Sequence, residues 1–244
     1  MREDLDYRVH AFRADEGTGL RLDAAYSVFH LPLVNAAHPD AVLHDPAIGI
    51  DHGRFREPRR SLVAFVSWDE LDETSALSTS IERVRRASFS PKVAWDSFAA
   101  RHDRLHVSIA SLGGELDVER VRRCLPLIGP LELRVCGLWA GRIRNTGRLY
   151  LPCYPCSVAG ERHNALQELQ RMAELPVTRF FGIGILNLTD HLNPEEAQEL
   201  VDITSASSVV EIARYRIRTL SIIDTYDSLL NDFTVIESFV ATAS

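Results

Sequence analysis

The chain has 244 residues, of which 45% are apolar, 25% charged and 8% aromatic. This composition is typical of a globular protein with one large or two small domains, and it excludes a disordered chain, a collagen-like repeat and a coiled coil. The formal net charge of −7 excludes attraction of nucleic acid through overall charge, so we expect any polyanion site to be a local pocket and expect no binding of duplex DNA.

Membrane association is not indicated by the sequence. No apolar run approaches the roughly 18 residues that span a bilayer, and the first residues lack the apolar region of a signal peptide. We therefore expect a cytoplasmic protein without a membrane partner. The sequence does not indicate an oligomeric state.

Residues 1–58 differ from the rest of the chain. Asp, His, Pro and Gly are frequent there, and the apolar runs are short, which predicts turns and loops. From residue 61 onward the apolar periodicity is regular. We expect an N-terminal extension, residues 1–58, packed on a core domain of residues 59–244.

The core domain alternates predicted strands and helices. The predicted elements are strand 61–68, helix 75–87, strand 104–112, helix 117–128, strands 131–141 and 147–154, helix 161–175, strand 178–189 and helix 194–203. Leu77, Ile81 and Val84 fall three or four residues apart in helix 75–87, and Asp117 and Asn193 are the expected N-caps of helices 117–128 and 194–203. Strands 131–141 and 147–154 are expected to form a hairpin around residues 145–147. The segment 213–241 predicts two long strands joined by a turn at about 227–232.

A weak internal repeat is visible in this order. Strand, turn and helix follow one another at 104–125 and again at 182–201. A repeat of this kind predicts an α+β fold of two pseudo-symmetric lobes, whose antiparallel sheets face a central cleft with helices on the outside.

The first strand of the repeat carries the clearest chemical signal. Alternation along the strand places His106 and Ser108 on one face and the aliphatic residues Leu105, Val107 and Ile109 on the other. An imidazole beside a hydroxyl offers a proton carrier and a hydrogen-bond donor to a phosphate under attack. A structural histidine whose hydrogen bonds are satisfied within the fold would give the same sequence pattern.

In this context the chain resembles the 2H phosphoesterase superfamily, which includes RNA 2′,3′-cyclic phosphodiesterases formerly called 2′-5′ RNA ligases. Members carry two H-x-[ST] motifs on equivalent strands of two lobes. The resemblance covers about residues 60–240, with His106-Val107-Ser108 as the first motif and Asn187-Leu188-Thr189 at the place of the second. It implies that His106 exchanges protons and that Ser108 and Thr189 hold phosphate oxygens.

Asn187 departs from the pattern of that family. An amide can donate a hydrogen bond to an oxyanion, but it cannot exchange a proton near neutral pH. His191, two residues beyond Thr189, is a candidate for the missing acid, although a surface-loop histidine is the alternative interpretation. The extension supplies further imidazoles that could be delivered to the lobes, at His10, His30, His38, His44 and His52.

Candidate ligand contacts flank these motifs. Arg179 and Tyr150 lie on predicted strands that should border the cleft, and Arg is suited to clamping a phosphate. An edge arginine in solvent is the alternative interpretation for Arg179. We expect no cofactor and no metal, because Cys153 and Cys156 lack a second pair of ligands at metal spacing and no nucleotide-binding glycine motif occurs.

Three hypotheses about function follow. The first is a metal-independent phosphodiesterase that acts on a cyclic phosphate or a 2′-5′-linked nucleotide or RNA end, weakened by Asn187. The second is a nucleotide-binding or phosphometabolite-binding protein that uses the same cleft without turnover. The third is an α+β interaction module in which the motif is coincidental, since fold alone does not establish activity.

Overall fold

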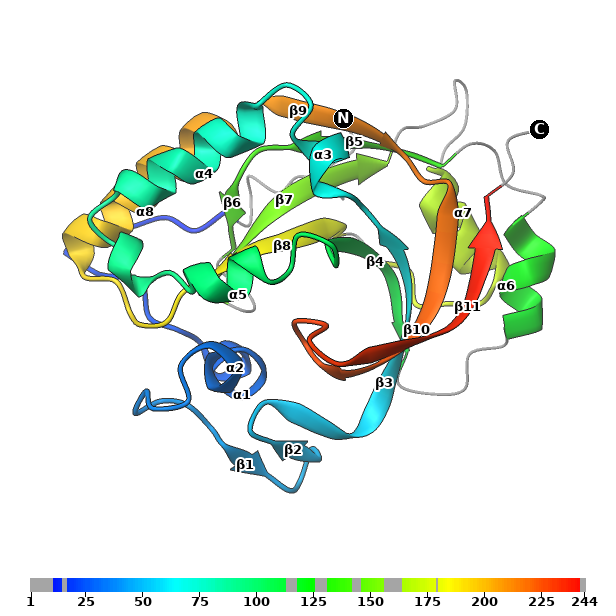
Figure 1. Ribbon diagram of the computed structural model, residues 1–244, viewed down its shortest axis with the longest axis horizontal. Coiled ribbons are helices and arrows are strands. Elements are labelled where there is room, and N and C mark those ends of the chain that lie inside the picture. Colours follow the sequence, from blue (N-terminus) through cyan, green and yellow to red (C-terminus); the bar gives the residue numbers. More distant parts are fainter. Residues whose placement is uncertain are drawn as a thin grey trace.

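Antiparallel strands occupy the middle of the molecule and short helices lie around them in the computed structural model (Figure 1). The structure describes residues 11–14, 17–112, 118–125, 131–141, 146–155, 164–178 and 180–241. The predicted helix cap at Asp117 and the predicted turn residue Asn145 lie outside the described residues. No helix within these ranges is long and apolar enough to cross a membrane.

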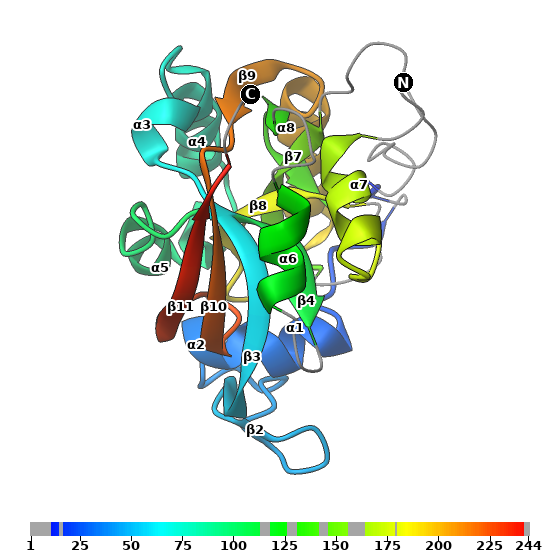
Figure 2. The same ribbon diagram turned by 90° about the vertical axis from the view of Figure 1, so that its right-hand side faces the viewer.

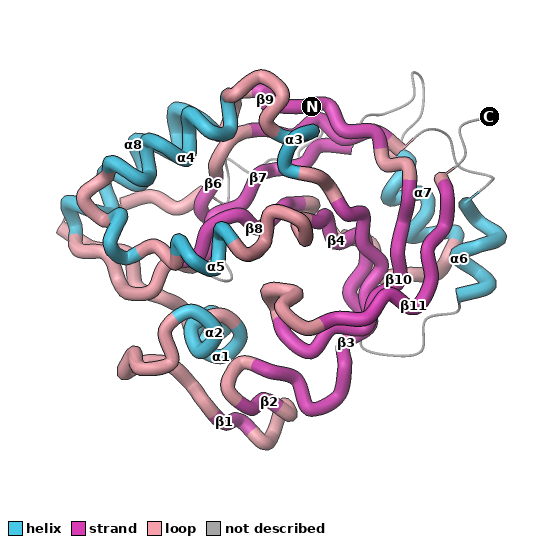
Figure 3. Tube along the Cα trace, viewed as in Figure 1, coloured by secondary structure: helices cyan, strands magenta, loops and turns pink. Residues whose placement is uncertain are grey.

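The helices are short, and most of them connect strands. They are α1 (Ala24–Phe29), α2 (Leu31–Val34), α3 (Trp68–Leu71), α4 (Ala76–Arg86), a 3₁₀ turn (Ser90–Lys92), α5 (Trp95–Ala99), α6 (Val118–Cys124), α7 (Ala165–Met172) and α8 (Pro194–Ser207). Figure 3 shows α4 beside α8 on one side of the strands and α6 beside α7 on the other.

The strands pair in the antiparallel sense throughout the described residues. They are β1 (His44–Asp45), β2 (Ile50–Asp51), β3 (Arg54–Phe65), β4 (His106–Leu112), β5 (Glu132–Cys136), β6 (Trp139–Ala140), β7 (Arg148–Pro155), β8 (Gly182–Asn187), β9 (Glu211–Arg216), β10 (Thr219–Asp227) and β11 (Phe233–Val240). Their order is β1-β2-β3-β4-β8-β7-β5-β9, with β10 beside β3, β11 beside β10 and β6 beside β7. The expected α+β fold is confirmed.

Local sequence signals account for the main helices. The predicted helix 75–87 is α4, and it buries Leu77, Ile81 and Val84, the residues whose spacing predicted it. The predicted helix 194–203 is α8, which begins with Pro194 after the predicted cap Asn193. The Asn193 side chain accepts a hydrogen bond from the N–H of Glu196, and the Glu196 carboxylate accepts one from the N–H of Asn193, a capping box that fixes the start of the helix.

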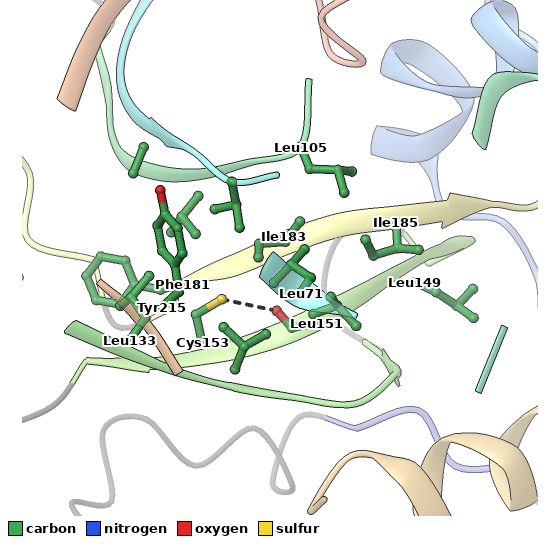
Figure 4. Packing of buried hydrophobic residues seen from close by; sticks show 14 of the residues in the cluster. Leu71, Leu105, Leu133, Leu149, Leu151, Cys153, Phe181, Ile183, Ile185 and Tyr215 are labelled. Atoms are coloured by element: carbon green, nitrogen blue, oxygen red, sulfur yellow. Dashed lines mark hydrogen bonds between the residues drawn. The ribbon is translucent and has the colours of Figure 1, made fainter. Parts of the chain in front are cut away.

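Buried aliphatic side chains occupy one face of the central strands. Figure 4 shows Leu105 near Ile183 and Ile185, with Phe181 and Leu151 in the same cluster. Each of these side chains is at most 1% exposed, and burial of a side chain of this size contributes about 1.5–3 kcal/mol. Because residues alternate along a strand, this packing turns His106 and Ser108 of β4 toward the opposite face.

The predicted first long strand of the C-terminal segment is two strands. β9 pairs with β5, whereas β10 pairs with β3 and β11, so the chain changes its pairing partners at Ile217 and Arg218. The N–H of Ile217 donates to the carbonyl of Leu131 at this crossing. Apolar alternation continues through the break, and for this reason the sequence pattern does not reveal it.

The N-terminal segment contains structure that its composition did not predict. Helices α1 and α2 lie against the lower ends of β3 and β10 (Figure 2). Leu20 pairs with Leu192 through both backbone groups, and the Tyr26 hydroxyl donates to the carbonyl of Leu188 at 2.6 Å. β3 runs across the expected boundary at residues 58 and 59, so the extension and the core share one strand.

Candidate functional site

A pocket of about 220 Å³ lies on the face of β3 and β4 that does not contact the main core. Its polar and charged lining includes His106 and Ser108 from β4, Arg148 from β7, Asp227 from the end of β10 and His30 from the N-terminal segment. Residues far apart in sequence therefore converge here. This convergence of imidazole, hydroxyl and guanidinium groups makes the pocket the candidate site.

His106 has a defined tautomer. Its Nδ1 atom lies 3.1 Å from the carbonyl oxygen of Arg104, so Nδ1 carries the proton and donates it. The Nε2 atom is then the basic nitrogen. Burial, and to a smaller extent the positive charges of Arg148 and Arg101, lower the pKa of His106 to about 3. The imidazole of His106 is therefore neutral near pH 7, with Nε2 as its unprotonated nitrogen.

Two arginines make the region around His106 strongly positive. Arg148 is 9% exposed and Arg101 is 1% exposed. Within the described part of the chain, neither forms an ion pair, and Arg148 Nε and Arg101 Nη1 are buried without a hydrogen-bond partner. Burial, followed by repulsion from Arg148, lowers the pKa of Arg101 to about 9, so it stays charged near pH 7.

The buried carboxylate of Asp227 does not neutralise this charge through an ion pair. Its two oxygens accept hydrogen bonds from the N–H groups of Leu229, Asn231 and Asp232, which hold the turn between β10 and β11. A buried cation without an anionic partner is costly, because desolvation of the charge is not compensated. The pocket therefore suits an anionic ligand that supplies the missing charge.

The part of β8 beside His106 and Ser108 carries no polar side chain. Val107 pairs with Ile183, and Gly182 and Gly184 flank this partner. Neither glycine has a side chain that could move a proton or donate to a phosphate. The equivalence of Asn187-Leu188-Thr189 to His106-Val107-Ser108 stays a prediction.

Arg148 occupies the space above Gly184. An added Cβ at Gly184 would overlap the Arg148 guanidinium, which lies against this part of β8. The absence of a side chain at Gly184 thus makes room for a cation.

Asn187 and Thr189 have other contacts. Asn187 is 2% exposed, pairs with Arg148 in the sheet, and accepts a hydrogen bond at its carbonyl from Ala94 N–H. Thr189 donates its N–H to the carbonyl of Lys92 and accepts at its own carbonyl from Asn35. Neither is among the residues that line the pocket, because both follow the segment of β8 that faces His106.

His191 also lies outside the pocket lining. Its Nδ1 accepts a hydrogen bond from Leu22 N–H at 3.1 Å, and its Nε2 lies 2.8 Å from the Asp40 carboxylate. These contacts attach the N-terminal segment to the loop before α8. The position assigned to His191 as a displaced acid in the cleft is therefore not supported by its contacts.

Arg179 and Tyr150 were predicted to contact a ligand, and the structure describes only Tyr150. Arg179 lies outside the described residues. Tyr150 is on β7, where its ring packs against Trp139 and Phe180 and lies under the Arg148 guanidinium at 5.3 Å. Tyr150 does not line the pocket, but it helps to position Arg148, which does.

His30 and Arg59 are pocket residues that the strand motifs did not identify. His30 is 2% exposed and lies between α1 and α2. Arg59, at the exposed rim, places its guanidinium 4.0 Å from the centre of the Phe55 ring and 5.0 Å from that of Phe29. Only the histidine-rich composition of the extension pointed to a contribution from this part of the chain.

Two groups in the described residues contain metal-ligand types. One is His38, Asp190 and His191, and the other is His44, Asp51 and His52 on an exposed hairpin. In the first group, His38 Nδ1 and His191 Nδ1 each accept a hydrogen bond from a backbone N–H group. The Nε2 atom of each histidine therefore carries the proton and donates it to a carboxylate. A metal-bound Nε2 requires a protonated Nδ1, so this arrangement favours His–Asp hydrogen bonds over metal binding.

Cys153 is a buried residue of the hydrophobic core. It is fully buried, its Sγ donates to the carbonyl of Leu151 (Figure 4), and burial raises the pKa of the thiol. A protonated, inaccessible thiol is not a nucleophile. Cys156 lies outside the described residues.

Comparisons with known proteins give weak similarities. No family model and no curated protein matches the chain. A conserved protein of unknown function from Agrobacterium tumefaciens is 14% identical, with a TM-score of 0.42 over 99% of this chain and 100% of that chain. Escherichia coli LigT, in complexes with 3′-AMP and with ATP, is 16% identical, with a TM-score of 0.37 over 76% of this chain and 99% of that chain. These values assign the chain to no family.

Proposed function

We propose that the pocket binds the phosphate of a cyclic phosphate or of a 2′-5′-linked nucleotide or RNA end, and that the protein cleaves this phosphodiester. The observation that carries the proposal is the Arg148 guanidinium, which lines the pocket without an ion pair in the described residues beside the neutral imidazole of His106, with the charge of the buried Arg101 nearby. A phosphodiester supplies the negative charge that these cations lack.

The groups in the pocket have distinct tasks under this proposal. His106 Nε2 accepts the proton of the attacking hydroxyl or water, because its Nδ1 already donates to a carbonyl. Arg148, which lines the pocket, offers its guanidinium to a phosphate oxygen. The exposed hydroxyl of Ser108, two residues from His106 on the same face, donates to another oxygen.

Binding without turnover is the second candidate function. The observation that favours it is that Asn187 and His191, the residues expected in place of a second catalytic histidine, do not line the pocket. Loss of one acid/base partner costs about 10²–10⁴-fold in rate. A pocket with a single proton carrier would therefore retain ligands better than it cleaves them.

A paired assay separates these functions. Purified protein is tested for cleavage of 2′,3′-cyclic nucleotides and 2′-5′ dinucleotides, and calorimetry measures binding of the same compounds. Under the proposed cleavage, His106→Gln lowers kcat by at least about 10²-fold and changes affinity by less than about tenfold. Arg148→Gln lowers affinity by about tenfold or more.

Matched controls are available on the surface. His44→Gln removes an exposed imidazole from the hairpin and Arg56→Gln removes an exposed guanidinium from β3, and both variants should behave as the wild type. Binding without detectable cleavage would favour the second function. An absence of both binding and cleavage for all compounds would contradict the assignment of the pocket.

A further inference from the structure

The N-terminal segment places a second imidazole in the pocket. His30 ends α1, is 2% exposed, and lines the pocket together with His106. Its neighbourhood also contains the Tyr26 ring, at 5.2 Å between ring centres, and the Ser228 side chain. The charged and titratable residues that line the pocket with it are Arg59, His106, Arg148 and Asp227.

The segment that carries His30 is attached to the core on both sides of it. Before His30, the Asp23 carboxylate accepts hydrogen bonds from the N–H and hydroxyl of Thr146, each at 3.0 Å. After His30, the Asn35 amide donates to the carbonyl of Thr189 at 3.0 Å. The position of His30 is thus fixed by the core, as catalysis requires of a proton carrier.

Ser228 sets the tautomer of His30. The Ser228 hydroxyl donates its proton to the carbonyl of Phe29, so its oxygen accepts a hydrogen bond from His30 Nδ1 at 2.7 Å. A hydroxyl has one proton to give, which leaves Nδ1 as the protonated nitrogen. Proton exchange with a ligand would therefore take place at Nε2, as it would for His106.

We propose that His30 is the second proton carrier of this pocket and donates a proton to the leaving oxygen of the phosphodiester. The inference rests on the proposed cleavage and identifies its acid. Gly182 and Gly184, which flank the β8 partner of Val107, carry no acid, and a pKa of about 3 leaves His106 without a proton to donate near pH 7. His30 and His106 are the imidazoles among the described residues that line the pocket.

The proposed step is balanced for a 2′,3′-cyclic phosphate. A water oxygen forms a bond to phosphorus while His106 Nε2 takes a proton from that water. The bond between phosphorus and one ribose oxygen breaks, and protonated His30 gives its Nε2 proton to that oxygen. The product is a phosphomonoester with a free ribose hydroxyl, and solvent exchanges the proton from His106 back to His30.

The test compares two substrates that differ in their leaving groups. A 2′,3′-cyclic nucleotide releases an alkoxide, which needs protonation, whereas uridine 3′-(4-nitrophenyl phosphate) releases a nitrophenolate, which does not. His30→Gln should lower kcat for the cyclic nucleotide by about 10²–10⁴-fold, with KM within about threefold, and for the nitrophenyl ester by less than about tenfold. It should also remove the high-pH limb of the kcat profile, where the acid loses its proton.

Ser228→Ala supplies a positioning variant. It retains the His30 imidazole but removes the hydroxyl that accepts from Nδ1, so the same high-pH limb should shift rather than disappear. His52→Gln, on the exposed hairpin of the same segment, is the matched control and should leave both rates and the profile unchanged.

The outcomes distinguish this inference from the proposed function. The ratio of the two rates within one variant does not depend on the fraction of folded protein, so partial misfolding does not obscure it. Equal losses on both substrates, or an unchanged rate on the cyclic nucleotide, would overturn the role of His30 while leaving cleavage intact. A wild type that binds these compounds but cleaves neither would overturn both the cleavage and the acid.

Discussion

At the scale of single residues, the arginine above Gly184 is central to the site. Arg148 lies on β7, but its guanidinium crosses over β8 because Gly184 leaves the space open. The Tyr150 ring beneath the guanidinium limits its movement. Its buried Nε has no hydrogen-bond partner in the described residues, so the protein compensates the charge of this guanidinium only in part.

We predict that Gly184→Ala weakens anion binding without unfolding the protein. The new methyl group would displace the end of a flexible side chain, the Arg148 guanidinium, rather than backbone. The expected loss in affinity for inorganic phosphate is about tenfold, or about 1.4 kcal/mol, measured by calorimetry. Gly182→Ala is the matched control, because its closest contact is the Phe180 ring at 3.3 Å. Equal losses for the two variants would contradict this explanation.

We predict that His106 makes the protein less stable as the pH falls. The pKa of His106 in the folded state, about 3, is below the ordinary value of 6.5, so the unfolded chain binds the extra proton between these values. Its contribution to stability is complete above about pH 6.5 and decreases below it, by at most about 1.4 kcal/mol per pH unit.

Urea unfolding at several pH values between 5 and 8 measures this effect. The difference in free energy of unfolding between wild type and His106→Gln should decline as the pH is lowered, whereas it should be constant above about pH 7. His44→Gln corrects for an exposed histidine. A difference that is independent of pH would show that His106 titrates normally in the folded protein.

At the scale of elements, short helix α1 determines where His30 lies. Its N-cap Asp23 accepts from Tyr26 N–H at 2.7 Å through one carboxylate oxygen, and the other oxygen accepts both hydrogen bonds from Thr146. One side chain therefore starts the helix and attaches it to the β7 end of the core. Asp23 thus combines the helix cap and the attachment to the core, although it is not among the residues that line the pocket.

We predict that Asp23→Ala destabilises the protein by about 1–3 kcal/mol, because it removes a helix cap and a connection to the core together. It should also weaken binding of inorganic phosphate, since α1 carries Phe29 and His30 into the pocket. Urea unfolding and calorimetry measure the two effects. Ser67→Ala, which removes the exposed N-cap of α3, should lower stability by less and leave phosphate affinity unchanged. Unchanged phosphate affinity in Asp23→Ala would show that α1 keeps its place without this carboxylate.

Local sequence patterns predicted helices α4 and α8, but they did not predict the break between β9 and β10 or the short helices α1 and α2. The apolar spacing in α4 and the cap of α8 predicted both helices, because those signals depend on neighbours in sequence. The break between β9 and β10 arises because β9 pairs with β5 and β10 pairs with β3, and these partners lie far apart in sequence. α1 and α2 span only Ala24–Phe29 and Leu31–Val34, and helices this short depend on tertiary contacts rather than on periodicity.

At the scale of the whole molecule, the site is shared among regions that sequence analysis treated separately. The strand that carries His106 was predicted by alternation, but the residues of β8 that lie beside it depend on the register of the sheet, which places Ile183 opposite Val107. Arg148 and His30 reach the pocket through sheet pairing and the packing of the extension. Neither type of contact leaves a periodic signal in the sequence.

This shared construction couples ligand binding to attachment of the N-terminal segment. Phe29 and His30 line one side of the pocket, and His106 and Arg148 line another. If the segment detaches, the pocket loses a wall, so a ligand binds the attached state more tightly. A bound ligand must therefore favour attachment by the same free energy that attachment contributes to binding.

We predict that a phosphate ligand protects the segment from trypsin. Arg21 is exposed just before α1 and Arg86 is exposed at the end of α4. Saturating phosphate, at 100 times its dissociation constant, should slow cleavage after Arg21 by up to about 100-fold where local detachment exposes the site, since binding at that excess stabilises the attached state by about 2.7 kcal/mol. Cleavage after Arg86 should slow less, because opening near α4 leaves the pocket intact. Mass spectrometry of the fragments over time gives both rates. At the same phosphate concentration, Gly184→Ala should reduce the maximal protection at Arg21 from about 100-fold to about tenfold, because its dissociation constant is expected to be about tenfold higher. Equal protection at both sites would mean that the segment detaches only when the whole protein unfolds.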